Sequence, residues 1–198
     1  MVQIATTTPN RGGRPRDPQV DVRIVEAVIA ELAAAPFSRM RMDDVAARAG
    51  VAKTTLYRRY PSKVALVRAA LEQYLTRFRL LDSPDVEAVL ADATQQQVDE
   101  FASGAAGVAL SNLCAEATHN PELATVVRQA FSAKRHEFAG LLRRGVADGV
   151  LRADLDVDLF ADLLLAVFPY RLLVSGEPVP HDLAGRLPRA LLEGARAR

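Results

Sequence analysis

The sequence predicts an all-α protein of about nine helices, and three observations support this. Apolar residues recur at helical spacing in several stretches of the 198 residues. Turn-forming pairs such as Asn-Pro and Asp-Gly separate these stretches. No alternation of apolar and polar residues is long enough to predict a strand. Because 49% of the residues are hydrophobic, the chain can bury a sizeable core.

The first predicted helix follows a basic amino-terminal arm, residues 1–16, that we expect to be flexible. Asp17 offers a helix cap, Pro18 suits the first helical position, and Pro36 closes the helix. The side that faces the core is marked by apolar residues at intervals of four, namely Ile24, Val28 and Leu32.

The second and third predicted helices meet at Gly50. The second helix runs from about Met42 to Ala49, and Gly50 can adopt the positive φ that ends it. Ala46 is small enough to let the two helices approach, and the gap between them is filled by Val51 and Leu56. This spacing predicts a helix-turn-helix, in which the second helix of the pair reads base edges in DNA.

The residues around this turn follow a specific pattern. They read Val45-Ala46-x-x-Ala49-Gly50-Val51-Ala52-Lys53-x-Thr55-Leu56-Tyr57-x-x-Tyr60-x-x-Lys63. This run closely resembles the DNA-binding motif of the TetR family of one-component bacterial transcriptional regulators. A weaker likeness, to a late helix of one branch of that family, covers residues 170–178. The resemblance implies a helix-turn-helix DNA-binding domain followed by a helical regulatory and dimerisation domain.

The chain departs from the family pattern at two helix starts. Arg41 stands where Ser or Thr usually caps the second helix, and Ala52 stands where Ser is common before the third. A missing cap costs about 1 kcal/mol. Asp43 and Asp44 partly compensate, because acids in a first turn suit the helix dipole.

The predicted DNA contacts lie on the third helix. If Leu56 faces the core, the outward side chains are Lys53, Thr54, Thr55, Tyr57 and Arg58. Lysine and arginine can donate to guanine, and a threonine methyl can meet that of thymine. The resemblance implies that Thr55, Tyr57 and Lys63 bind phosphates, while positions 53, 54 and 58 approach bases. Alternatively, Arg58 and Arg59 merely solvate the helix surface, and Tyr60 is expected to pack between helices.

Positive charge is concentrated in the amino-terminal third, as phosphate binding requires. Residues 1–63 hold 11 Lys and Arg against 6 Asp and Glu, whereas residues 64–198 hold 14 against 18. Within the arm, Arg14 and Arg16 flank Pro15 in a sequence that resembles the core of an AT-hook. The arm either inserts these arginines into an A·T-rich minor groove or adds only non-specific attraction.

A break at residues 83–85 divides the predicted DNA-binding domain, residues 17–80, from a ligand-binding and dimerisation domain, residues 84–198. Ser62 caps a fourth helix that reaches about Arg79. Five more helices are expected over residues 85–102, 105–118, 121–148, 156–175 and 182–196. The last two should pair with those of a second copy, with Leu165 and Leu172 on the shared face.

A small apolar ligand is implied by the resemblance, not by a motif. The candidate wall of its pocket consists of Phe101, Leu110, Cys114, Phe131, Phe138, Leu164 and Phe168, each of which is more often ordinary core. Pro169 lies inside a helical run, where it either kinks the helix and opens space or marks the helix end.

No catalytic, cofactor or metal site is expected. The histidines His119, His136 and His181 lack metal-ligand spacing. The acids at 154, 156, 158 and 162 lack the glycine and final glutamate of a calcium loop. One cysteine, no signal peptide and no apolar run of about 20 residues predict a soluble cytoplasmic protein outside the membrane.

These observations predict a regulator and not an enzyme. We expect a homodimeric, sequence-specific DNA-binding transcriptional regulator, a repressor released from its double-stranded operator by a small apolar ligand. The alternatives are a ligand-independent regulator or an activator. From another class, the alternative is a helical enzyme that kept a helix-turn-helix scaffold.

Overall fold

The computed structural model describes residues 18–102 and 104–195, and it contains no β-strand within these ranges. The amino-terminal helices are α1 (Pro18–Ala34), α2 (Met42–Ala49), α3 (Lys53–Arg59) and α4 (Lys63–Leu75). They are followed by α5 (Val86–Ala102), α6 (Ala105–Ala117), α7 (Pro121–Ala147), α8 (Val157–Tyr170), the π-helix η1 (Arg171–Ser175) and α9 (Leu183–Glu193). The predicted all-α class is confirmed.

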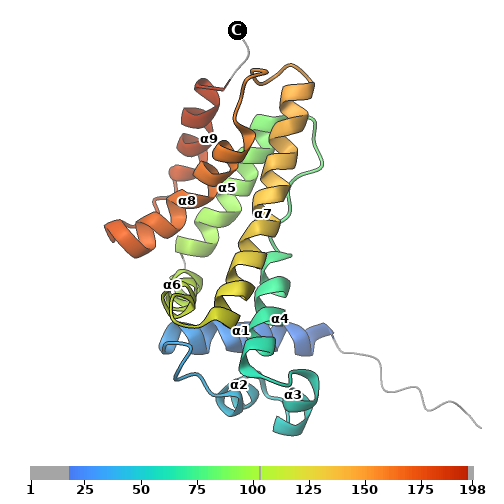
Figure 1. The fold of residues 1–198 in the computed structure, drawn as a ribbon, viewed down its shortest axis with the longest axis vertical. Helices are drawn as coiled ribbons and strands as arrows, with labels where there is room; N and C mark the ends of the chain where they lie inside the picture. Colours follow the sequence, from blue (N-terminus) through green and yellow to red (C-terminus); the bar gives the residue numbers. More distant parts are fainter. Residues whose placement is uncertain (1–17, 103, 196–198) are drawn as a thin grey trace, which may run out of the picture.

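The helices form two ends joined by the long α7 (Figure 1). At one end α1 lies crosswise to α7, with α2 and α3 beyond it. At the other end α5, α8 and α9 pack beside the second half of α7. The long α7 contributes buried residues to the hydrophobic clusters at both ends.

The local signals at the helix-turn-helix were predicted correctly. Gly50 follows α2 with φ of 64°, in the left-handed region. Neither Arg41 nor Ala52 accepts a capping hydrogen bond, whereas the Ser62 hydroxyl accepts one from the Ala65 amide at 3.1 Å. Leu56 is fully buried between the helices. The uncapped starts of α2 and α3 are therefore held by packing.

The amino-terminal core extends beyond the first four helices. Ile24, Val28 and Leu32 are buried on the inner side of α1. The same cluster includes Leu113 from α6 and Leu123 from α7. The predicted domain boundary falls in the segment between α4 and α5, and the division into two domains stays a prediction.

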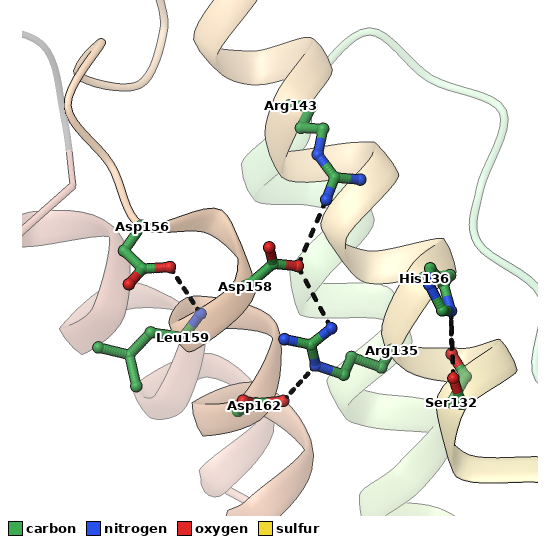
Figure 2. Close-up of polar contacts among 8 residues, drawn as sticks. All are labelled: Ser132, Arg135, His136, Arg143, Asp156, Asp158, Leu159 and Asp162. Atoms are coloured by element: carbon green, nitrogen blue, oxygen red, sulfur yellow. Dashed lines mark hydrogen bonds and ion pairs between the residues drawn. The ribbon is translucent and has the colours of Figure 1, made fainter. Parts of the chain in front are cut away.

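Ion pairs fasten α8 to α7 on the outside of the molecule (Figure 2). Arg135 of α7 pairs with Asp162 at 2.6 Å and with Asp158 at 3.3 Å, and Arg143 pairs with Asp158 at 3.3 Å. Asp156 instead caps α8, accepting from the Leu159 amide. In the described part of the chain no group of His, Cys, Asp and Glu is arranged to hold a metal ion.

The carboxyl-terminal part of α8 decides between the two alternatives for Pro169 and corrects the prediction for Leu165 and Leu172. Pro169 does not end the helix, because helical backbone continues for one residue and then widens into η1. The prediction that Leu165 and Leu172 lie on an outer face is wrong. Leu165 packs half-buried against the core, and the Leu172 methyl groups lie over Gly107 of α6.

The outer face of α8 carries other apolar side chains. Leu159, Leu163 and Tyr170 are exposed on α8, followed by Leu173 and Val174 on η1. Because this helix is apolar on two sides, the spacing of its leucines could not tell the inner side from the outer one.

Candidate nucleic-acid interface and apolar cavity

The predicted contact residues of α3 lie on its outer side. Lys53, Thr54, Tyr57 and Arg58 are exposed, and Thr55 is half-buried. Tyr60 packs against the core, as expected. The structure thus brings the five residues of the predicted surface together on one short helix.

Asp43 of α2 connects two of these side chains. One carboxylate oxygen accepts from the Lys53 amine at 2.7 Å, and the other accepts from the Tyr57 hydroxyl at 3.1 Å. The hydrogen bond from Lys53 lowers the pKa of Asp43, and the same bond raises the pKa of Lys53. Both groups are therefore ionised at neutral pH. The hydrogen bond to Asp43 also raises the pKa of Tyr57.

Three arginine side chains at this end of the molecule form no hydrogen bond or ion pair with any described residue. They are exposed, and they are Arg39, Arg41 and Arg58. Arg59, by contrast, pairs with Asp21 of α1, which distinguishes its role from that of Arg58. Arg39 and Arg41 were not predicted as DNA contacts, because only the fold brings Arg41 within electrostatic reach of Lys53 and Tyr57.

Lys63 forms contacts within the protein that the sequence did not indicate. Its amine donates to the carbonyl of Phe37 at 2.7 Å and to that of Ser38 at 3.2 Å, and it lies 4.3 Å from the centre of the Phe37 ring. Desolvation lowers the pKa of Lys63. In the free protein this lysine therefore ties the α1–α2 loop to the start of α4. Arg14 and Arg16 of the arm lie outside the described residues.

An apolar cavity of about 100 Å³ lies between the two ends of the molecule. Its walls come from α1, α4, α5, α6, α7 and α8. Four of the predicted wall residues line it, namely Phe101, Leu110, Phe131 and Phe138. The cavity therefore has an apolar lining that suits a small apolar molecule.

The other three predicted wall residues lie outside this lining. Phe168 is buried and stacks on Phe101, with ring centroids 5.3 Å apart. Leu164 belongs to the core formed with α5, α7 and α9. Cys114 packs half-buried against the amino-terminal core, where desolvation raises the pKa of its thiol. Their spacing suggested inward side chains but could not separate core from cavity.

Polar groups at the cavity are few and mostly occupied. The Lys134 amine donates to the Phe78 carbonyl and to Glu137. The Tyr74 hydroxyl is buried without a well-formed hydrogen bond, and desolvation, with neighbouring Glu100, raises its pKa. A ligand with little polarity fits these surroundings best.

The cavity touches the helices that carry the helix-turn-helix. Val28 and Leu32 of α1 and Leu71 of α4 form part of its wall. Among the described residues, no helix is both long enough and apolar enough to cross a lipid bilayer.

Comparison with known proteins identifies relatives for both ends of the chain. Residues 24–70 match the family described as bacterial regulatory proteins, tetR family, and residues 80–191 match the tetracyclin repressor-like, C-terminal domain. The chain is 28% identical to the uncharacterized HTH-type transcriptional regulator YdeS of Bacillus subtilis, over 95% of this chain and 96% of the relative.

Two further relatives carry informative names. The DNA-binding transcriptional repressor TetR of Mycobacteroides abscessus is 29% identical, over 76% of this chain and 80% of the relative. The crystal structure of the TetR family transcription regulator SCO0332 superposes with a TM-score of 0.69 at 31% identity, covering 89% of this chain and 98% of the other.

Proposed function

The chain belongs to the TetR family of bacterial regulatory proteins and is a DNA-binding transcriptional regulator, and we propose that it is a homodimeric repressor that a small apolar ligand releases from its operator. In this proposal residues 17–80 bind DNA, and residues 84–198 bind the ligand and the second subunit. The name of the Mycobacteroides abscessus relative supports the choice of repressor.

We infer that α3 enters the major groove. Arg58 and Thr54 are exposed there, and Lys53 stands at the amino-terminal start of the helix, where recognition helices contact bases. The phosphates would be contacted by Tyr57, Thr55 and the unpaired Arg39 and Arg41. Lys63 would also contact a phosphate, through the third N–H of its amine, because the carbonyls of Phe37 and Ser38 occupy the other two.

The dimer proposal rests on the outer face of α8. Leu159, Leu163 and Tyr170 form an exposed apolar stripe at helical spacing, and Val174 continues it. A stripe of this kind is typical of a helix that packs against another helix. Two copies joined there would present two α3 helices to successive half-sites of an operator.

One observation carries the ligand proposal: the cavity is bounded by α1 and α4 as well as by the helices of the carboxyl-terminal half. A molecule that fills it must contact both parts. If it fits a conformation in which the α3 helices are wrongly spaced, its binding lowers DNA affinity by the ratio of its affinities for the two conformations.

The experiment starts with an operator selected from random duplex DNA by the purified protein. A library of small apolar compounds is screened for a rise in melting temperature, and operator affinity is measured with each hit. We expect hits to weaken operator binding by about tenfold or more. Leu110→Trp, which places a larger side chain at the cavity, should reduce both effects.

Two results would change the proposal. Compounds that stabilise the protein and leave operator affinity unchanged would indicate a ligand-independent regulator. A reporter gene with the operator in its promoter separates the other alternative, because a repressor lowers expression and an activator raises it.

A further inference from the structure

Asp43 is the only described acidic residue that contacts the predicted DNA-reading side chains of α3. Both of its carboxylate oxygens are used, one by the Lys53 amine and one by the Tyr57 hydroxyl. The Asp43 side chain is 28% exposed and that of Lys53 is 64% exposed, and the remaining donors of the Lys53 amine form no other hydrogen bond with the described residues. The contact lies at the surface that would face DNA.

An acid at this position is unexpected for binding alone. A carboxylate near DNA phosphates is repelled by them, and an ion-paired lysine releases fewer counterions than a free one. Asp43 also has a specific geometric effect, because it links α2 to α3 across the turn and restricts the long Lys53 side chain to one direction. The contact therefore weakens the non-specific attraction of Lys53 to DNA phosphates and fixes the position of its amine.

We propose that Asp43 determines specificity by holding Lys53 in position for a base edge and away from phosphates. This inference depends on the proposed DNA-binding surface of α3. On the operator, the amine keeps its bond to Asp43 and donates another to a base. On other DNA the base at that place presents its acceptors in a different position, or in cytosine only a donor, and Asp43 prevents the amine from turning to a phosphate instead. Asp43 thus weakens binding to non-operator DNA more than binding to the operator.

The chain provides a matched control in Asp44. It is the next residue, lies in the same first turn of α2 and is exposed, and its side chain forms no hydrogen bond or ion pair within the described residues. Asp43→Asn and Asp44→Asn make the same change in net charge and in interaction with the helix dipole. Only the first breaks the ion pair with Lys53, and it leaves one amide oxygen where Asp43 has two acceptors for Lys53 and Tyr57.

The experiment measures the affinity of full-length wild type and both variants for two duplexes over a range of salt concentrations. One duplex is the selected operator, and the other has the same composition in scrambled order. For Asp43→Asn we expect about threefold to tenfold tighter binding to the scrambled duplex and a logarithmic salt slope steeper by about one, since one more amine reaches a phosphate. The ratio of operator to scrambled affinity should fall correspondingly, and Asp44→Asn should leave that ratio unchanged.

A second pair of variants tests whether Asp43 acts through Lys53. In a Lys53→Gln background, Asp43→Asn should no longer change the affinity ratio or the salt slope. Asp43→Ser, which removes the same carboxylate, repeats the test with a different side chain, and circular dichroism checks the fold of each variant.

The outcomes that overturn the inference are distinct from those that overturn the proposed function. If Asp43→Asn and Asp44→Asn changed the affinity ratio equally, Asp43 would act only through its charge. An effect that persists without Lys53, or no change on the scrambled duplex, would also refute its role. If wild type itself prefers no sequence, the proposed function fails and this inference fails with it.

Discussion

The side-chain amide of Asn112 donates a hydrogen bond of 2.7 Å to the backbone carbonyl of Leu32. Leu32 is in the last turn of α1, where carbonyls lack partners within the helix. Asn112 is on α6, and the neighbouring Leu113 lines the cavity together with Leu32. We therefore expect a displacement of α6 at the cavity to shift the end of α1 and the loop that leads into α2.

The first prediction removes this bond. Asn112→Ala should lower the free energy of unfolding by about 1–2 kcal/mol, because a half-buried carbonyl loses its partner. It should also reduce the fold-change in operator affinity that a ligand produces. Denaturant unfolding and operator titration with ligand measure the two effects. Ser111→Ala, which removes a bond within α6 only, should change neither by much.

The second prediction separates two adjacent arginines. Arg58→Ala should cost about 1–3 kcal/mol of operator affinity and relax the base preference at one position of each half-site. Arg59→Ala should leave preference intact and lower stability by up to about 1 kcal/mol, because its partner is Asp21 of α1. Selection of bound sequences with each variant is the measurement. Unchanged preference in Arg58→Ala would mean that Arg58 does not read bases and only contributes charge to the surface of α3.

The third prediction concerns Lys63. Lys63→Ala should weaken binding to operator and scrambled DNA alike, and it should lower the free energy of unfolding by about 1–3 kcal/mol as its bonds to the α1–α2 loop are lost. Arg39→Ala removes a cation from the same loop that has no described partner. It should weaken DNA binding without loss of stability. Equal melting temperatures for both variants would contradict the structural role of Lys63.

The fourth prediction tests the outer face of α8. Leu163→Asp should yield monomers, because an unpaired charge in an apolar contact is strongly unfavourable. Leu81→Asp is the control, since Leu81 is 45% exposed, similar to the 40% of Leu163, but lies between α4 and α5. Light scattering at micromolar concentration distinguishes dimer from monomer. A wild type that is already monomeric would refute the dimer proposal.

The fifth prediction compares two glycines of α7. A Cβ on Gly145 would lie 2.9 Å from a methyl group of Leu151 and 3.0 Å from one of Val86, both of which are buried. Gly145→Ala should therefore destabilise the protein by about 1–3 kcal/mol. Gly140 has no neighbour within 4 Å of that position, so Gly140→Ala should stabilise the helix by about 0.5–1 kcal/mol. Thermal and denaturant unfolding should show opposite signs.

The features that could be predicted from the sequence are local in the chain. The buried stripe of α1, the turn at Gly50 and the cap at Ser62 each depend on residues a few positions apart. The same is true of the order and approximate bounds of the helices, which follow from turn residues and periodicity.

The features that were missed depend on contacts between distant segments. Asp43 and Lys53 are ten residues apart, and nothing in their types indicates that they meet. The carbonyl partners of Lys63 lie about 25 residues before it. Leu165 was assigned to the wrong side of α8, because both sides of that helix are apolar and only the positions of α5 and α7 decide between them.

The shared amino-terminal core has a consequence for how this regulator can be recombined. The core of α1 to α4 also contains Leu113 and Leu123, which come from α6 and α7. A chimera that joins residues 18–75 to the regulatory half of a relative would replace both leucines, and with them Asn112. To exchange operator specificity between relatives, substitution of residues on α3 therefore disturbs fewer core contacts than transfer of the whole helix-turn-helix segment.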